Sequence, residues 1–83
     1  MFKKGDIVFY ARCIPENGLY EVCELKIRTV NQEEGWIVGV DKRDKRAYLL
    51  TKNEKSKRVF EERKDALDVV LLEEDKNRSN GEE

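Results

Sequence analysis

The chain has 83 residues, which is room for one domain. Apolar residues make up 39% of it and charged residues 42%, against roughly 25% charged in an average soluble protein. The longest unbroken apolar run, residues 7–11, is far shorter than the ~20 residues of a membrane helix. No apolar stretch of signal-peptide length follows residues 1–4. We therefore expect a small cytoplasmic globular domain with no membrane contact.

The chain contains no histidine, which is the commonest general base and metal ligand. Cys13 and Cys23 alone cannot complete a zinc site, and their spacing is not that of a redox pair. Phosphate-binding glycine motifs are also missing from the sequence. We therefore predict two free thiols packed as small hydrophobes, no metal, no cofactor and no enzymatic activity.

Charge is unevenly distributed along the chain. Residues 1–40 carry a net charge of -1, residues 41–58 carry +5 and residues 59–83 carry -5. Residues 73–83 have no large apolar side chain to offset the entropy of ordering, so we predict a disordered acidic tail over residues 76–83.

The first two thirds of the sequence have the composition and alternation of β-strands. Strands are predicted over 6–12, 19–31, 36–40 and 46–51, joined by turns at 15–18, 32–35 and 41–45. Residues 52–57 are predicted to form a polar loop, and residues 58–60 a short extended segment. Trp36 and Tyr48 fit either a core or an exposed position.

The segment 19–31 does not alternate cleanly. Its apolar residues fall on two parities, Tyr20 and Val22 on one and Cys23, Leu25 and Ile27 on the other. A β-bulge near Cys23-Glu24 would reconcile the two halves. At the preceding turn, a two-residue Asn17-Gly18 loop places Cys13 opposite Val22, whereas a three-residue loop places it opposite Cys23.

A helix is predicted over about 62–75, because Ala66, Leu67, Val70 and Leu71 share one helical face. Val69 and Leu72 widen this apolar stripe. They either pack against the sheet as well or form an exposed patch for a partner.

These elements predict a mainly β fold, a small bent antiparallel SH3-like barrel of four to five strands followed by one C-terminal α-helix, within a single domain over residues 1–72. This fold is supported by residues 4–10 (KGDIVFY), at the start of the first strand, and by residues 59–67 (VFEERKDAL), which lead into the helix. They resemble the small uncharacterised SH3-like-barrel proteins of bacteriophages and low-GC Gram-positive bacteria. This resemblance implies the fold but no assigned activity.

Two functions fit this architecture. The first is a non-enzymatic protein-interaction or accessory module, phage- or prophage-encoded, that binds an unknown protein partner through an exposed strand edge or a Val69 and Leu72 patch. The second is weak nucleic-acid binding by the basic 42–46 turn, helped by an exposed aromatic ring. Its candidate contacts are Lys42, Arg43, Lys45, Arg46 and Tyr48. Asp41 and Asp44, together with the acidic isoelectric point of about 5.6, favour the first function.

Overall fold

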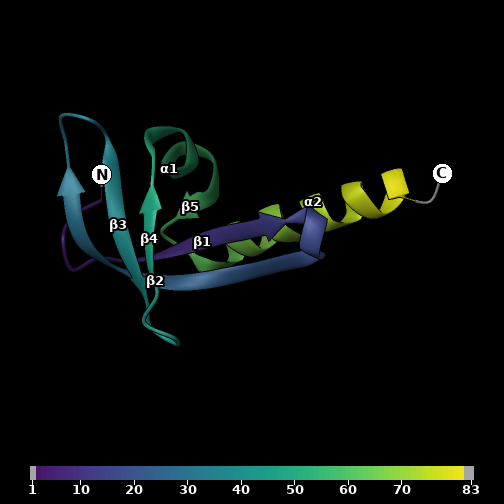
Figure 1. Cartoon of the computed structure of the whole chain (residues 1–83), viewed down its shortest axis with the longest axis horizontal. Coiled ribbons are helices and arrows are strands. Elements are labelled where there is room, and N and C mark those ends of the chain that lie inside the picture. The colour runs from purple at the N-terminus through teal and green to yellow at the C-terminus, as the bar shows by residue number, and fades with distance from the viewer. Residues whose placement is uncertain (1, 82–83) are drawn as a thin grey trace.

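The computed structural model describes residues 2–81, which form one antiparallel sheet and a long C-terminal helix (Figure 1). The strands are β1 (Ile7–Ile14), β2 (Leu19–Asn31), β3 (Trp36–Asp41), β4 (Ala47–Leu50) and β5 (Val59–Phe60). The helices are the 3-10 turn η1 (Pro15–Asn17), α1 (Lys52–Arg58) and α2 (Arg63–Gly81). The sheet order is β4-β3-β2-β1-β5. The predicted mainly β fold with a C-terminal helix is confirmed, and the sheet does not close, because β4 and β5 are its two unpaired edges.

Strand β2 joins the two halves of the sheet. It pairs with β1 over Leu19–Lys26 and with β3 over Leu25–Asn31, and it turns between the two (Figure 1). The register with β3 shifts between Ile27 and Thr29. The bulge predicted near Cys23-Glu24 is therefore wrong in position, and Arg28 is the extra residue.

The mixed parity of β2 has a different cause, because both faces of the β1–β2 pair are buried. One cluster contains Val8, Cys23, Leu25, Ile27, Ile37, Leu50 and Val59. The other contains Ala11, Ala66 and Val70, with Phe9, Cys13, Tyr20, Val22, Phe60 and Val69 packed against it. We call the face that carries this second cluster the α2 face, since α2 covers it along β1 and β2 (Figure 1).

The β1–β2 hairpin has neither of the predicted registers. Ile14 lies opposite Leu19 and Cys13 opposite Tyr20, because the turn takes four residues. It begins at Pro15, a favoured first residue of a helical turn, and ends at Gly18 with φ +64. The two cysteines belong to clusters on opposite faces of the sheet and are free thiols, as predicted.

The helix α1 replaces the polar loop predicted over residues 52–57. Thr51 precedes the helix, and both its backbone N–H and its hydroxyl lie within hydrogen-bond distance of Glu54 Oε1, at 3.4 and 3.2 Å. This arrangement satisfies a donor that the first helical turn leaves unpaired. The Thr-x-x-Glu pattern of residues 51–54 is the sequence signal for this helix start.

The C-terminal helix α2 is longer than predicted. It runs from Arg63 to Gly81, so the disordered tail predicted from residue 76 is wrong for residues 76–81, while 82–83 lie outside the described residues. Lys76 and Arg78 have good helix propensity, and local side-chain contacts support the weaker helix formers beside them. Asn77 Nδ2 donates to the Glu73 carbonyl oxygen at 3.0 Å, and Arg78 pairs with Glu74 at 3.8 Å.

The buried stripe of α2 is rotated from the predicted one. Ala66 and Val70 are buried, whereas Leu67 and Leu71 are 44% and 53% exposed. Ala66 and Ala11 of β1 belong to one cluster and are both fully buried, so helix and strand pack closely where both side chains are small.

Candidate functional site

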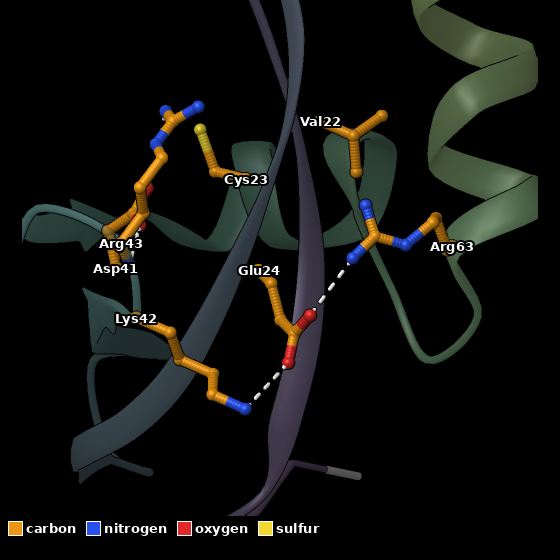
Figure 2. Close-up of a pocket in the computed structure, with 7 residues that line it drawn as sticks. All are labelled: Val22, Cys23, Glu24, Asp41, Lys42, Arg43 and Arg63. Carbon is orange, nitrogen blue, oxygen red and sulfur yellow. Dashed lines mark hydrogen bonds and ion pairs between the residues drawn. The ribbon is translucent and has the colours of Figure 1, made fainter.

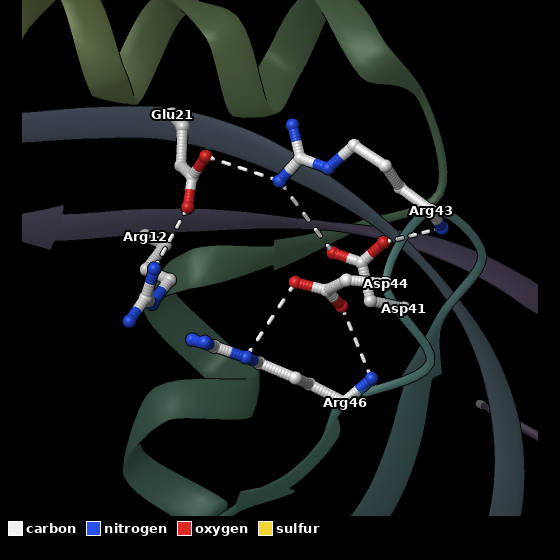
Figure 3. Close-up of polar contacts among 6 residues, drawn as sticks. All are labelled: Arg12, Glu21, Asp41, Arg43, Asp44 and Arg46. Atoms are coloured by element: carbon white, nitrogen blue, oxygen red, sulfur yellow. Dashed lines mark hydrogen bonds and ion pairs between the residues drawn. The ribbon is translucent and has the colours of Figure 1, made fainter.

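Two aspartates of the basic turn between β3 and β4 accept hydrogen bonds from the backbone of the turn (Figure 3). Asp41 Oδ1 accepts the Arg43 N–H at 2.7 Å, and Asp44 Oδ1 accepts the Arg46 N–H at 3.0 Å. The carbonyl oxygen of Asp41 also accepts the Lys45 N–H at 2.9 Å. Lys45 itself lies in the left-handed region of backbone space, at φ +64. The side chain of Asp41 is buried. The two aspartates therefore hold the turn in shape.

Three cations of the turn are neutralised by carboxylates, two of which lie about twenty residues upstream. Arg43 pairs with Glu21 at 3.3 Å and lies 4.0 Å from Asp41. Arg46 pairs with Asp44 at 3.7 Å (Figure 3). Lys42 pairs with Glu24 at 3.0 Å. The turn is thus much less electropositive than its sequence indicates, which weakens it as a phosphate-binding site.

Glu21 is the centre of a half-buried charge network. Arg12 Nη1 donates to Glu21 Oε2 at 2.8 Å, and Arg43 donates to the other carboxylate oxygen. Burial by itself raises the pKa of Glu21, but the hydrogen bonds from Arg12 and Arg43 outweigh it, so the pKa lies below its ordinary value.

Replacing Glu21 with glutamine is expected to weaken the fold at neutral pH and to flatten its loss of stability in acid. Because the folded-state pKa is lowered from 4.5, the carboxylate stabilises the fold fully above that value, and the stabilisation is lost as the pH falls below it. Urea unfolding between about pH 7 and about pH 3 measures this. Glu33→Gln, at an exposed turn residue outside every ion pair between the described residues, is the control. An unchanged pH profile for Glu21→Gln contradicts the assignment.

Glu24 connects the turn to α2 (Figure 2). Its two carboxylate oxygens bind Lys42 at 3.0 Å and Arg63 at 2.9 Å. The hydrogen bond from Lys42 is the main cause that lowers the pKa of Glu24. Arg63 also lies over the Phe9 ring, 5.0 Å from its centroid. Glu24, Lys42 and Arg63 line a cavity of about 300 Å³, and the ion pairs between them give it a structural role.

A second group of cations lines a groove that the sequence did not indicate. Lys26, Arg28 and Lys45 surround it together with Lys4, and Val40 and Gly5 lie between them. The groove has a volume of about 640 Å³. None of the ion pairs between described residues involves these four cations. We call it the basic groove. Of its four free cations, only Lys45 was a predicted contact.

The candidate aromatic residue Tyr48 does not belong to this groove. It packs against the cluster that contains Leu25, and its ring lies 5.8 Å from that of Tyr10 at an angle of 54°. The Arg12 guanidinium lies 5.5 Å from the same ring. Trp36 is half-buried at the opposite end of β3 from the turn. Its Nε1–H donates to Glu34 Oε2 at 3.0 Å.

The two candidate partner contacts on α2 have different environments. Val69 packs against the cluster that contains Ala66, whereas Leu72 is 71% exposed. They do not form one exposed patch. Outside α2, Leu49 at the sheet edge is also strongly exposed, with 60% of its surface accessible.

The described residues offer little nucleophilic or metal-binding chemistry. Residues 2–81 contain no group of three or more Cys, Asp or Glu side chains placed to hold a metal ion. Burial raises the pKa of the Cys13 thiol, and it raises that of Cys23 to about 12. A thiol with a raised pKa is a poor nucleophile at neutral pH because little thiolate is present.

Neither helix of the described part combines the length and hydrophobicity needed to cross a bilayer. Comparisons of this chain with family models, with curated proteins and with solved structures found no match.

Proposed function

We propose that this chain is a small non-enzymatic protein-interaction module whose sheet is a partly open SH3-like barrel. The strand order supports this fold, because β5 pairs with β1 while β2, β3 and β4 form a meander. Cytoplasmic location and phage or prophage origin stay predictions from the sequence.

The observation that carries the proposal is the free edge of β4. The Asp41 N–H donates to the Arg46 carbonyl at 2.8 Å, which marks a hydrogen-bonded pair at the turn end of the ladder. Bonded and non-bonded pairs alternate in an antiparallel ladder, so Tyr48 bonds to β3. Ala47 and Leu49 therefore direct their N–H and C=O groups away from β3.

These outward groups are open to a partner strand. Ala47 and Leu49 are exposed, and no hydrogen bond outside the sheet, among those between described residues, involves their backbone. The four residues of β4 also carry no charge, although charged side chains are a common protection of natural edge strands. An extended segment can thus add a strand here, with Leu49 as an apolar contact.

The edge is tested by removing one outward donor. Leu49→Pro deletes the Leu49 N–H without deleting a bond to β3, and proline is tolerated at such edge positions. Immobilised wild-type protein is expected to retain partner proteins from a nuclease-treated lysate that Leu49→Pro loses. Leu49→Ala, which keeps the N–H, is the control, and thermal unfolding checks that both variants fold. Retention of the same proteins by Leu49→Pro, or loss of all retention after nuclease, contradicts the proposal.

A further inference from the structure

The geometry points to the basic groove as a second binding site, for an acidic, extended peptide segment of the partner. This inference rests on the proposed function, because it states the chemistry of the segment that the β4 edge receives. Its support is the convergence of four unpaired cations from three separate parts of the chain on one groove, which the turn before β4 helps to line.

Backbone contacts bring these cations together. The N-terminal segment lies along β2, since the Gly5 N–H donates to the Ile27 carbonyl at 2.8 Å and the Ile27 N–H donates to the Asp6 carbonyl at 2.9 Å. This pairing places Lys4 beside the bulge that contains Arg28. Tertiary pairing and the β2 bulge therefore build the groove.

Lys26 and Lys45 complete the groove from the β2–β3–β4 side. Lys26 lies opposite Val40, and Val40 lies opposite Ala47. Lys45 occupies a left-handed backbone position, where glycine or asparagine is usual. A lysine at this position carries a backbone cost, yet it puts an exposed ammonium at the mouth of the groove.

The charge of the groove favours an anionic ligand. Asp41 also lines the groove, but by strand alternation its carboxylate is buried on the opposite face of the sheet, the face of Leu25, where it accepts the Arg43 N–H. Lys42 is paired with Glu24. Lys4, Lys26, Arg28 and Lys45 therefore leave the groove with uncompensated positive charge. Carboxylates or phosphates are the groups that complement it.

The surroundings favour a peptide over a nucleic acid. The groove has no aromatic lining residue on which a base could stack, and the chain has a net charge of -1. By strand alternation, Lys26, Val40, Ala47 and Leu49 share the α2 face, so the groove and the outward side chains of β4 lie on the same face of the sheet, with Val40 of β3 between Lys26 and β4. A strand added at β4 presents every second side chain there. Acidic side chains at those positions lie on the same face as the groove, which Lys45 of the adjacent turn also lines.

The test is fluorescence anisotropy with a labelled peptide of about ten residues that alternates Glu and Val. Wild-type protein is expected to bind it, with affinity that falls as salt rises from about 50 to about 200 mM. Lys26→Glu combined with Arg28→Glu is expected to weaken binding at least roughly tenfold, because attraction becomes repulsion at two contacts. Lys26→Gln combined with Arg28→Gln is expected to show a smaller loss.

The matched control is Lys57→Glu combined with Lys64→Glu, which changes the net charge equally. Lys57 and Lys64 are exposed, lie outside the groove and belong to no ion pair between described residues. This control is expected to bind like wild type. Equal weakening in the control, equal binding of a Gln-Val peptide, or tighter binding of a duplex or single strand of about 20 nucleotides each overturns the inference.

The two experiments distinguish a wrong assignment of the basic groove from a wrong assignment of the β4 edge. If only the groove assignment is wrong, the Lys26 and Arg28 variants keep the lysate proteins that wild type retains while Leu49→Pro loses them. If only the β4 edge assignment is wrong, Leu49→Pro binds the Glu-Val peptide as wild type does, and that binding still depends on Lys26 and Arg28.

Discussion

Replacing Leu25 with alanine is expected to remove a large share of the stability of this fold. Leu25 is fully buried where the sheet bends, opposite Val8 on β1 and Asp41 on β3. The backbone of Gly39 packs so closely on it that a Cβ atom there would lie 3.0 Å from the Leu25 side chain. Truncation at such a site costs ~2–5 kcal/mol, against a total of about 4–12 kcal/mol for a domain of this size.

Leu67→Ala is the matched control for this prediction. It removes the same atoms from a residue that is 44% exposed, so its cost is expected to stay below about 1 kcal/mol. Urea unfolding of both variants measures the difference. Equal destabilisation by the two changes would show that Leu67, and not only Leu25, packs in a core.

Ala66→Asp is expected to detach α2 from the sheet. Ala66 is fully buried in the cluster that contains Ala11, and an unpaired carboxylate there costs more than about 3 kcal/mol. Detachment exposes Cys13, which packs against the same cluster. The expected results are a large loss in the free energy of unfolding and faster reaction of Cys13 with a thiol reagent.

Leu71→Asp introduces the same side chain on the same helix, at a residue that is 53% exposed. It is expected to change the free energy of unfolding by no more than about 0.5 kcal/mol. Cys13 is expected to react with the thiol reagent as slowly as in wild type. If Ala66→Asp unfolds the whole chain, Ala66→Ser is the milder variant, with an intermediate rise in Cys13 reactivity expected. Wild-type stability and reactivity for Ala66→Asp would place α2 elsewhere.

Local sequence patterns determined most of the elements but not how their faces are used. Alternation in 6–12, 19–31, 36–40 and 46–51 located four strands, and helical periodicity located α2. The same patterns misplaced the bulge in β2 and the buried stripe of α2. A strand buried on both faces has no single apolar parity, and the rotation of a helix depends on the surface on which it docks.

The sequence by itself determined that the chain has no histidine, two separate cysteines and an uneven charge distribution. It also determined the strands, their order along the chain and the terminal helix. Only the tertiary structure decided which charges are free. It brought Glu21 and Glu24 to the turn at 42–46 and gathered Lys4, Lys26, Arg28 and Lys45 around one groove. The physical reason is that electrostatic interaction depends on distance in space, and strand pairing sets those distances between residues far apart along the chain.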